Sequence, residues 1–109
     1  MVAKACLMVR AAVVDAADRP GFDRWYETEH LPDAVARFGA ERGWRAWSRT
    51  GPAVHYAFYE FADLERAQAV LASPELRAQV AEFDRAWGLR VTRARDILEV
   101  AGMVELNPA

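Results

Sequence analysis

Two adjacent titratable residues, Glu29 and His30, are the strongest candidates for chemistry in this sequence. At about 100° per residue, a helix over residues 22–30 places Glu29 on the same face as Phe22 and Trp25. A carboxylate packed against aromatic rings is desolvated, which raises its pKa and suits a general acid or base. His30 lies at the edge of that face, and the ordinary pKa of histidine suits proton transfer near neutral pH. We therefore expect both side chains to line one pocket, with His30 moving the proton and Glu29 tuning it or acting as the second acid or base.

Each of these two residues also has a simpler interpretation. Pro32 disfavours helical backbone in the residue before it, so the helix can unwind early and leave Glu29 in water or beside an arginine. His30 can instead cap the end of the helix. Neighbouring residues of a helix do not face each other, so the two side chains are not expected to form a hydrogen-bonded dyad.

The other residues that could react or bind ions form weaker patterns. His55 is expected to be a satisfied core or interface histidine, and Cys6 a small buried side chain within a strand. The spacing of histidine, cysteine and carboxylate residues matches no metal site, so neither a metal nor a cofactor is predicted. Arg93 and Arg95 share one face of a predicted strand and could clamp a carboxylate or phosphate, although solvated edges and intersubunit salt bridges are commoner roles for such residues.

The elements that must position these side chains follow from hydrophobic periodicity and from turn residues. Asp63 and the Ser-Pro-Glu sequence at 73–75 are typical of helix starts, whereas Gly39 and Gly88 are typical of helix ends. The order is βαββαβ, which predicts one ferredoxin-like α+β domain over residues 1–109, with helices on one face of a four-stranded antiparallel sheet. The predicted strands lie at 4–14, 43–49, 54–61 and, as one or two pieces, within 89–104, and the predicted helices lie at 22–30, 32–38, 63–72 and 73–87.

Aromatic residues are abundant, with four Trp, three Tyr and five Phe in 109 residues. Strand 54–61 places Tyr56 and Phe58 on one face, and Tyr59 and Phe61 on the other. An antiparallel sheet with one face in water should alternate apolar and polar residues, so both faces are expected to be covered. Helices cover one face, and a second copy of the sheet is the simplest cover for the other, which predicts a homodimer through the sheet faces. Half-exposed edge residues are the alternative.

Charge and composition disfavour several classes of function. There are 14 Lys and Arg residues against 16 Asp and Glu, a net charge of −2, which argues against nucleic-acid binding. The element order and the aromatics of 54–61 partly match an RNA-recognition motif, but its basic-glycine pair and its strand-one aromatic are missing. The longest run without charged residues, 50–59, is far shorter than the roughly 20 residues that span a bilayer. With one cysteine and no signal-peptide pattern, we expect a cytoplasmic protein that binds neither membranes nor nucleic acid.

The segment from Trp25 to Pro32, with the pattern Trp-Tyr-x-x-Glu-His-Leu-Pro, resembles the EthD-like family within the dimeric α+β barrel superfamily. The sequence Phe-Asp-Arg-Ala-Trp-Gly at 83–88 is similar to that family as well. The resemblance implies a ferredoxin-like protomer that packs its sheet on that of a second protomer, with a small-molecule pocket between sheet and helices. The superfamily includes lactone isomerases, polyketide cyclases and dehydratases, cofactor-free monooxygenases and haem-dependent enzymes. With two histidines, a haem ligand or a multi-histidine catalytic set is poorly supplied.

These observations give one leading hypothesis for the function and two alternatives. The leading hypothesis is a cofactor-independent enzyme that isomerises, cyclises or dehydrates a small aromatic, polyketide-like or lactone substrate by proton transfer at His30 and Glu29. The first alternative is a non-catalytic dimeric protein that binds a small metabolite, and the second is a cofactor-free monooxygenase. The side chains expected to form apolar pocket walls and a phenolic hydrogen bond are Trp25, Tyr26, Tyr56, Phe58 and Trp87.

Overall fold

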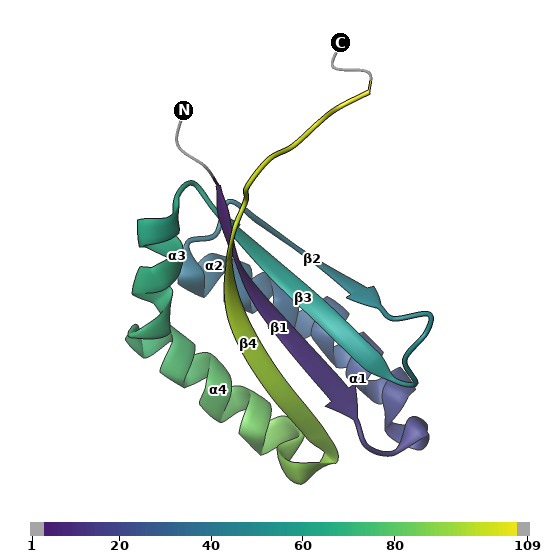
Figure 1. Cartoon of the computed structure of the whole chain (residues 1–109). Helices are drawn as coiled ribbons and strands as arrows, with labels where there is room; N and C mark the ends of the chain where they lie inside the picture. Colours follow the sequence, from purple (N-terminus) through teal and green to yellow (C-terminus); the bar gives the residue numbers. More distant parts are fainter. Residues whose placement is uncertain (1–3, 107–109) are drawn as a thin grey trace.

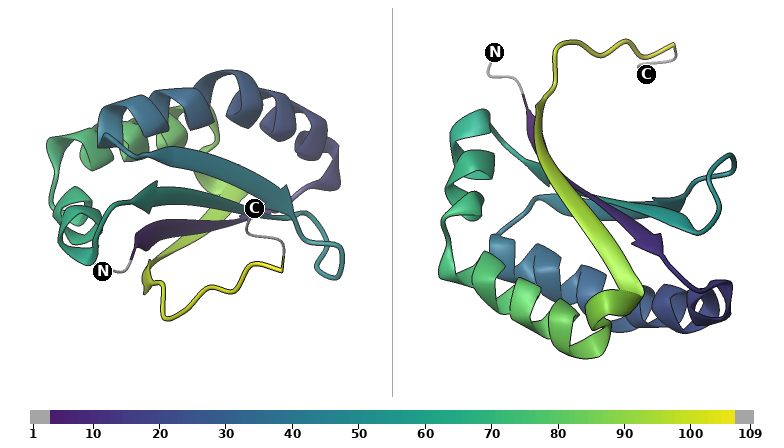
Figure 2. Two further views of the ribbon diagram at one scale, coloured as in Figure 1. Left: turned by 90° about the horizontal axis from the view of Figure 1, so that it is seen from above. Right: turned by 60° about the horizontal axis from the view of Figure 1, so that its bottom comes forward.

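The computed structural model describes residues 4–106 of the chain. The strands are β1 (Ala5–Val13), β2 (Arg42–Trp47), β3 (Val54–Phe61) and β4 (Val91–Glu99), and the α-helices are α1 (Arg19–Trp25), α2 (Leu31–Phe38), α3 (Leu64–Leu71) and α4 (Pro74–Ala86). The strands form one antiparallel sheet in the order β2-β3-β1-β4, and the helices cover one of its faces (Figures 1 and 2). The predicted ferredoxin-like α+β fold is therefore confirmed. Within residues 4–106, no helix has the length and apolar character needed to cross a bilayer.

Side-chain caps start the two helices that follow β3. The Asp63 carboxylate accepts a hydrogen bond from the backbone N–H of Arg66 at 2.8 Å, at the start of α3. The Ser73 hydroxyl accepts one from the N–H of Leu76 at 3.1 Å, at the start of α4. These contacts satisfy N–H groups that have no partner inside the helix. Both predicted helix starts are confirmed.

The first helical region differs from its prediction, because Pro32 does not interrupt it. A π-helical turn, Tyr26–His30, leads from α1 directly into α2, so that one helical run crosses the sheet (Figure 2). Pro32 lies in the first turn of α2. A proline at that position has a suitable φ, and its missing N–H removes no essential hydrogen bond. The run ends at Gly39, whose φ of 64° is the left-handed conformation that glycine adopts without strain.

The pairing register assigns each strand residue to one face of the sheet. Tyr59 pairs with Leu7, and both belong to the core between sheet and helices. Tyr56 and Phe58 alternate with Tyr59 along β3, so they point to the open face of the sheet. On β4, Arg95 pairs with Val9 of β1, which lies on the same face as Leu7. Arg95 is therefore also on the helix side.

Most of the aromatic side chains fill the core beneath the helices. Phe22 is fully buried, and its ring centre lies 5.2–6.1 Å from the centres of six other aromatic rings. Their planes are tilted or edge-on to that of Phe22, which is the preferred geometry for such pairs. The six rings belong to Trp25, Tyr26, Trp47, His55, Phe83 and Trp87.

The open face of the sheet carries a second, smaller aromatic group. Trp44 stacks on Phe58 with ring centres 5.3 Å apart, and Tyr56 stacks on Phe58 at 6.5 Å. Trp44 is 39% exposed in the isolated chain. The aromatic residues are thus divided between a helix-side core and an open sheet face.

Candidate active site

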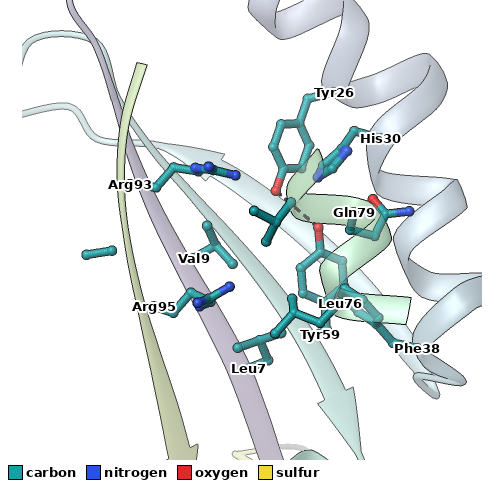
Figure 3. A pocket seen from close by; sticks show the side chains of 12 residues that line it. Leu7, Val9, Tyr26, His30, Phe38, Tyr59, Leu76, Gln79, Arg93 and Arg95 are labelled. Atoms are coloured by element: carbon teal, nitrogen blue, oxygen red, sulfur yellow. Dashed lines mark hydrogen bonds between the residues drawn. The ribbon is translucent and has the colours of Figure 1, made fainter. Parts of the chain in front are cut away.

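A pocket of about 230 Å³ lies between the sheet and the helical layer (Figure 3). Its walls are mostly apolar, and its polar groups are an imidazole, two phenols, one amide and two guanidinium groups. This combination is typical of a small-molecule site, although the volume is below the roughly 300–1,000 Å³ of most ligand pockets. The lining residues are Leu7, Val9, Tyr26, His30, Phe38, Tyr59, Leu76, Gln79, Val80, Arg93, Ala94 and Arg95.

The π-helical turn decides which side chains reach this pocket. The N–H of Leu31 bonds to the carbonyl of Tyr26, five residues earlier, in place of the usual four. Each residue of a π turn therefore advances less around the axis than the roughly 100° of an α-helix. The accumulated lag turns His30 closer to the face of Tyr26 and turns Glu29 away from it. Tyr26 and His30 are 1% and 8% exposed, and both line the pocket.

Glu29 is on the outside of the helix, so the predicted burial of its carboxylate against aromatic rings is wrong. The physical reason is the same lag, which turns the side chain away from the core. Glu29 borders a separate surface depression, and His30 lines this depression as well as the pocket. The two predicted residues therefore share the depression but not the pocket. The depression is also lined by Trp25, Asp33, Arg37 and Glu82. The alternative in which Glu29 reaches water holds, but through a change of helical pitch and without unwinding before Pro32.

The environment of His30 keeps its imidazole neutral. The ring stacks on Trp25 with centres 4.5 Å apart, and the rings of Tyr26 and Phe83 meet it edge-on at 4.9 and 5.5 Å. Burial lowers the pKa of His30 to about 4, against the opposing effect of the Asp33 carboxylate. Its Nδ1 atom is buried and has no hydrogen-bond partner within residues 4–106. At neutral pH the imidazole is therefore uncharged, and one of its two nitrogens can accept a proton. Figure 3 shows the ring pointing into the pocket.

Two phenols stand next to the imidazole. The hydroxyl oxygens of Tyr26 and Tyr59 are 3.1 Å apart in a buried hydrogen bond. Burial raises the pKa of Tyr26 to about 12 and that of Tyr59 well above its usual value, so both remain protonated. When one hydroxyl donates to the other, the second still has its own proton to donate. The pair therefore offers one hydrogen-bond donor to a ligand.

The remaining polar groups of the pocket are an amide, which lies on the same side as His30, and two guanidinium groups on the opposite side (Figure 3). Gln79 of α4 is 2% exposed, and its Nε2 donates to Asp33 Oδ2 at 2.6 Å. Arg93 of β4 forms an ion pair with Asp84, and its guanidinium carbon lies 4.1 Å from the centre of the Phe83 ring. Arg95 lies two residues further along β4 and lines the same pocket.

His55 belongs to a separate polar cluster at the core edge. Its Nε2 accepts a hydrogen bond from Arg45 Nε at 3.1 Å, and Arg45 also donates to Glu27 Oε1 at 2.7 Å and forms an ion pair with Asp23. Burial, reinforced by the positive charge of Arg45, lowers the pKa of His55 to about 3. The prediction of a core histidine fits its burial, but the ring is satisfied only in part: Nε2 accepts from Arg45, whereas Nδ1 is buried without a hydrogen-bond partner among residues 4–106. The Arg45 guanidinium holds the ring neutral.

The two buried histidines predict how stability depends on pH. Their folded-state pKa values, about 4 and about 3, lie below the unfolded value near 6.5, so the unfolded chain binds more protons as the pH falls. Above pH about 6.5 both histidines are neutral in the folded and the unfolded chain, so they should not lower the free energy of unfolding. Below that pH it should fall by up to about 1.4 kcal/mol per pH unit for each histidine. Urea unfolding followed by tryptophan fluorescence checks this; a His55→Asn variant should have a shallower slope, and equal slopes would contradict the assignment.

The other residues predicted for the site lie elsewhere. Tyr56 and Phe58 point to the open face of the sheet, on the side opposite the pocket, because the residues that face the helices along β3 are those of the other parity. Trp87 is packed in the core beside Phe22 and does not line the pocket. Trp25 contacts the outer face of the His30 ring. Of the predicted site residues, Tyr26 and His30 line the pocket, and Trp25, Glu29 and His30 line the surface depression beside it.

Sequence reasoning missed Tyr59 and Gln79 as pocket residues. Gln79 carried a signal, because it is a polar residue three positions after Leu76 on an otherwise apolar helix face. Tyr59 did not, because both faces of β3 are aromatic. Among residues 4–106, no group of three histidine, cysteine or carboxylate side chains comes together in the manner of a metal site.

Fold and pocket together define a ferredoxin-like α+β protein with a small cavity between sheet and helices. No protein-family model matches the sequence, and no curated protein is significantly similar to it. Solved structures are similar in fold. SnoaB, a cofactor-independent oxygenase from Streptomyces nogalater, is 14% identical, with a TM-score of 0.62 over 97% of this chain and 100% of that one.

Two further structures extend the comparison. An EthD family protein from Bacillus halodurans is 18% identical, with a TM-score of 0.59 over 84% of this chain and 96% of that one. A dimeric ferredoxin-like protein from an uncultured marine organism is 13% identical, with a TM-score of 0.52 over 94% of this chain and 99% of that one. At these identities the similarity establishes the fold and leaves the activity to be argued from the pocket.

Proposed function

We propose that the protein is a cofactor-independent enzyme that moves a proton on a small aromatic, polyketide-like or lactone substrate, leading to isomerisation, cyclisation or dehydration. The observation that carries this proposal is the neutral imidazole of His30 at the wall of a small, largely apolar pocket, beside a phenol that can donate a hydrogen bond. Perturbed titratable groups in such a cleft are typical of acid–base sites.

The reaction begins with removal of a proton from a carbon next to a carbonyl group. His30 takes the proton, and the electron pair moves to the carbonyl oxygen, which becomes an enolate. The hydroxyl pair of Tyr26 and Tyr59 donates a hydrogen bond to that oxygen, and the low polarity of the pocket strengthens this bond. The enolate in turn stabilises the imidazolium, which offsets the low pKa of the free base. His30 then returns the proton to a different atom.

The structural similarity to SnoaB favours a second candidate, a cofactor-free monooxygenase. Its first step would be the same deprotonation at His30, followed by reaction of the carbanion with molecular oxygen. Oxygen consumption separates the two candidates, because proton transfer alone consumes none.

An exchange assay tests the leading proposal without a known substrate. Small enolisable aromatic ketones and lactones are incubated with the protein in D2O, and loss of the acidic C–H signal is followed by NMR, with oxygen uptake measured in parallel. Enzyme-dependent exchange without oxygen uptake is expected. Binding of these compounds without exchange would contradict catalysis and favour the non-catalytic metabolite-binding protein.

We also propose that the functional unit is a homodimer that buries the open sheet faces. The aromatic group formed by Trp44, Tyr56 and Phe58 supports this, as does the dimeric state stated for the marine structural neighbour. Sedimentation analysis should give a dimer for the wild type and a monomer for Trp44→Glu. Leu71→Glu, at an exposed position of α3 on the helix side, should remain dimeric. A monomeric wild type, or a dimer that tolerates Trp44→Glu, would contradict the proposal.

A further inference from the structure

We propose that the ligand of this pocket is a small ring-containing acid that also carries a hydroxyl group, with its carboxylate at Arg93 and Arg95 and its hydroxyl donating to Gln79. The inference rests on the proposed function in that it concerns the same pocket, and it specifies what that pocket selects.

The first observation is the fixed orientation of the Gln79 amide. Asp33, which also pairs with Arg37 at 3.0 Å, accepts the hydrogen bond from Gln79 Nε2. A carboxylate only accepts, so the amide nitrogen must face Asp33, and the amide oxygen must face away from it. Figure 3 shows that oxygen on the pocket side and the nitrogen on the far side.

The Gln79 oxygen has no partner. It is completely buried and receives no hydrogen bond within residues 4–106. A buried acceptor without a donor is unfavourable, and native proteins satisfy nearly all such groups with protein, water or ligand. Because Gln79 lines the pocket, a ligand that carries an O–H group would satisfy it.

The second observation is the charge of the pocket wall. Two of the twelve lining residues are arginines, and none is acidic. Arg93 shares its charge with Asp84, whereas Arg95 is exposed and takes part in no ion pair within residues 4–106. Figure 3 shows both guanidinium groups extending from β4 over the pocket. Guanidinium groups bind carboxylates with paired, charge-assisted hydrogen bonds.

The positive charge and the unsatisfied acceptor lie on different walls of the pocket. The positive charge comes from β4, and the unsatisfied acceptor comes from α4, with aliphatic and aromatic side chains between them. A ligand that meets both must carry an anion and a donor at separate ends of an apolar core. A hydroxylated aromatic acid has that layout, and one ring fits a pocket of about 230 Å³.

Titration calorimetry with four probes tests the assignment: 3-hydroxybenzoate, 4-hydroxybenzoate, benzoate and methyl 3-hydroxybenzoate. At least one hydroxybenzoate should bind about tenfold or more tightly than benzoate, and 3-hydroxybenzoate should exceed its methyl ester by a similar factor. Equal affinity for acid and ester, or no binding of either hydroxybenzoate, would overturn the inference.

Two variants locate the contacts. Arg95→Gln should weaken the carboxylates by about tenfold and leave the ester unchanged, while Arg24→Gln, an exposed arginine of α1 outside the pocket, should change neither. Gln79→Met should remove the preference for the hydroxyl group. If Gln79→Met does not fold, the comparison of hydroxybenzoates with benzoate in the wild type still decides that contact. Wild-type affinities that Arg95→Gln leaves unchanged would refute the carboxylate assignment.

The inference and the proposed function fail separately. Tight, Arg95-dependent binding of hydroxybenzoates, with no proton exchange from any ketone or lactone, would uphold the ligand class and refute the catalytic proposal. Exchange that requires His30 but depends neither on Arg95 nor on the ligand's charge would uphold the catalytic proposal and refute the ligand class.

Discussion

Replacing His30 with Gln is expected to slow proton exchange from a bound ketone or lactone by about 10²–10⁴-fold. Gln retains hydrogen-bonding capacity but cannot accept a proton at neutral pH. Because the imidazole acts in the transition state, the loss should fall on kcat, with KM changed by less than about tenfold. The measurement is the exchange rate in D2O as a function of substrate concentration. Wild-type turnover by the variant would remove His30 from the mechanism.

The pH profile of kcat/KM and a Glu29→Gln variant provide two further checks on the role of His30. Since the pKa of His30 is lowered to about 4, the base is present across the neutral range, and kcat/KM should be flat between pH about 5.5 and 8. A rise centred near pH 6.5 would instead indicate an imidazole of ordinary pKa. Glu29→Gln should retain the wild-type rate within about threefold, because the structure places this carboxylate outside the pocket.

Phe22→Ala is expected to lower the free energy of unfolding by about 3–5 kcal/mol. The side chain is fully buried among six aromatic rings, so truncation leaves a cavity as well as removing apolar burial. Domains of this size have a total stability of roughly 5–15 kcal/mol, so the variant should be close to unfolding at 25 °C. Urea unfolding followed by circular dichroism measures the change.

A matched substitution controls for the loss of apolar surface alone. Leu89, which follows α4, is 97% exposed, and Leu89→Ala should change stability by no more than about 0.5 kcal/mol. Phe22→Leu, which fills part of the space, should cost less than Phe22→Ala. If Phe22→Ala costs under 1 kcal/mol, about the effect of an average substitution, the aromatic cluster does not organise the helix that carries His30.

The order of elements could be predicted because local signals and tertiary structure agree. Asp63 and Ser73 start helices through side-chain hydrogen bonds that depend on neighbouring backbone alone, and Gly39 ends one through a φ that other residues avoid. The continuous helix through Pro32 was not predictable on these terms. It requires a π turn, a shift by one hydrogen-bond partner that tertiary packing selects and that no residue type marks.

The candidate site was predictable only where the predicted face of a residue does not depend on the π turn. Tyr26 and His30 lie four residues apart and share a face in either helical form, whereas Glu29 keeps its predicted face only without the π turn. Alternation along β3 separated Tyr56 from Tyr59 but could not show which of them faces the helices, since both faces are aromatic. Gln79 enters the site through the packing of α4 on the sheet, which is a long-range property.

The most direct test of the central claim, that a neutral His30 imidazole faces a ligand in the pocket, is an NMR titration of the two histidine rings. His55→Asn assigns their signals, because the chain contains two histidines. We expect His30 to stay neutral down to pH about 5 in the free protein and its pKa to rise when 3-hydroxybenzoate binds, since a nearby anion stabilises the imidazolium. A His30 ring that titrates near pH 6.5 and does not respond to the ligand would contradict that claim.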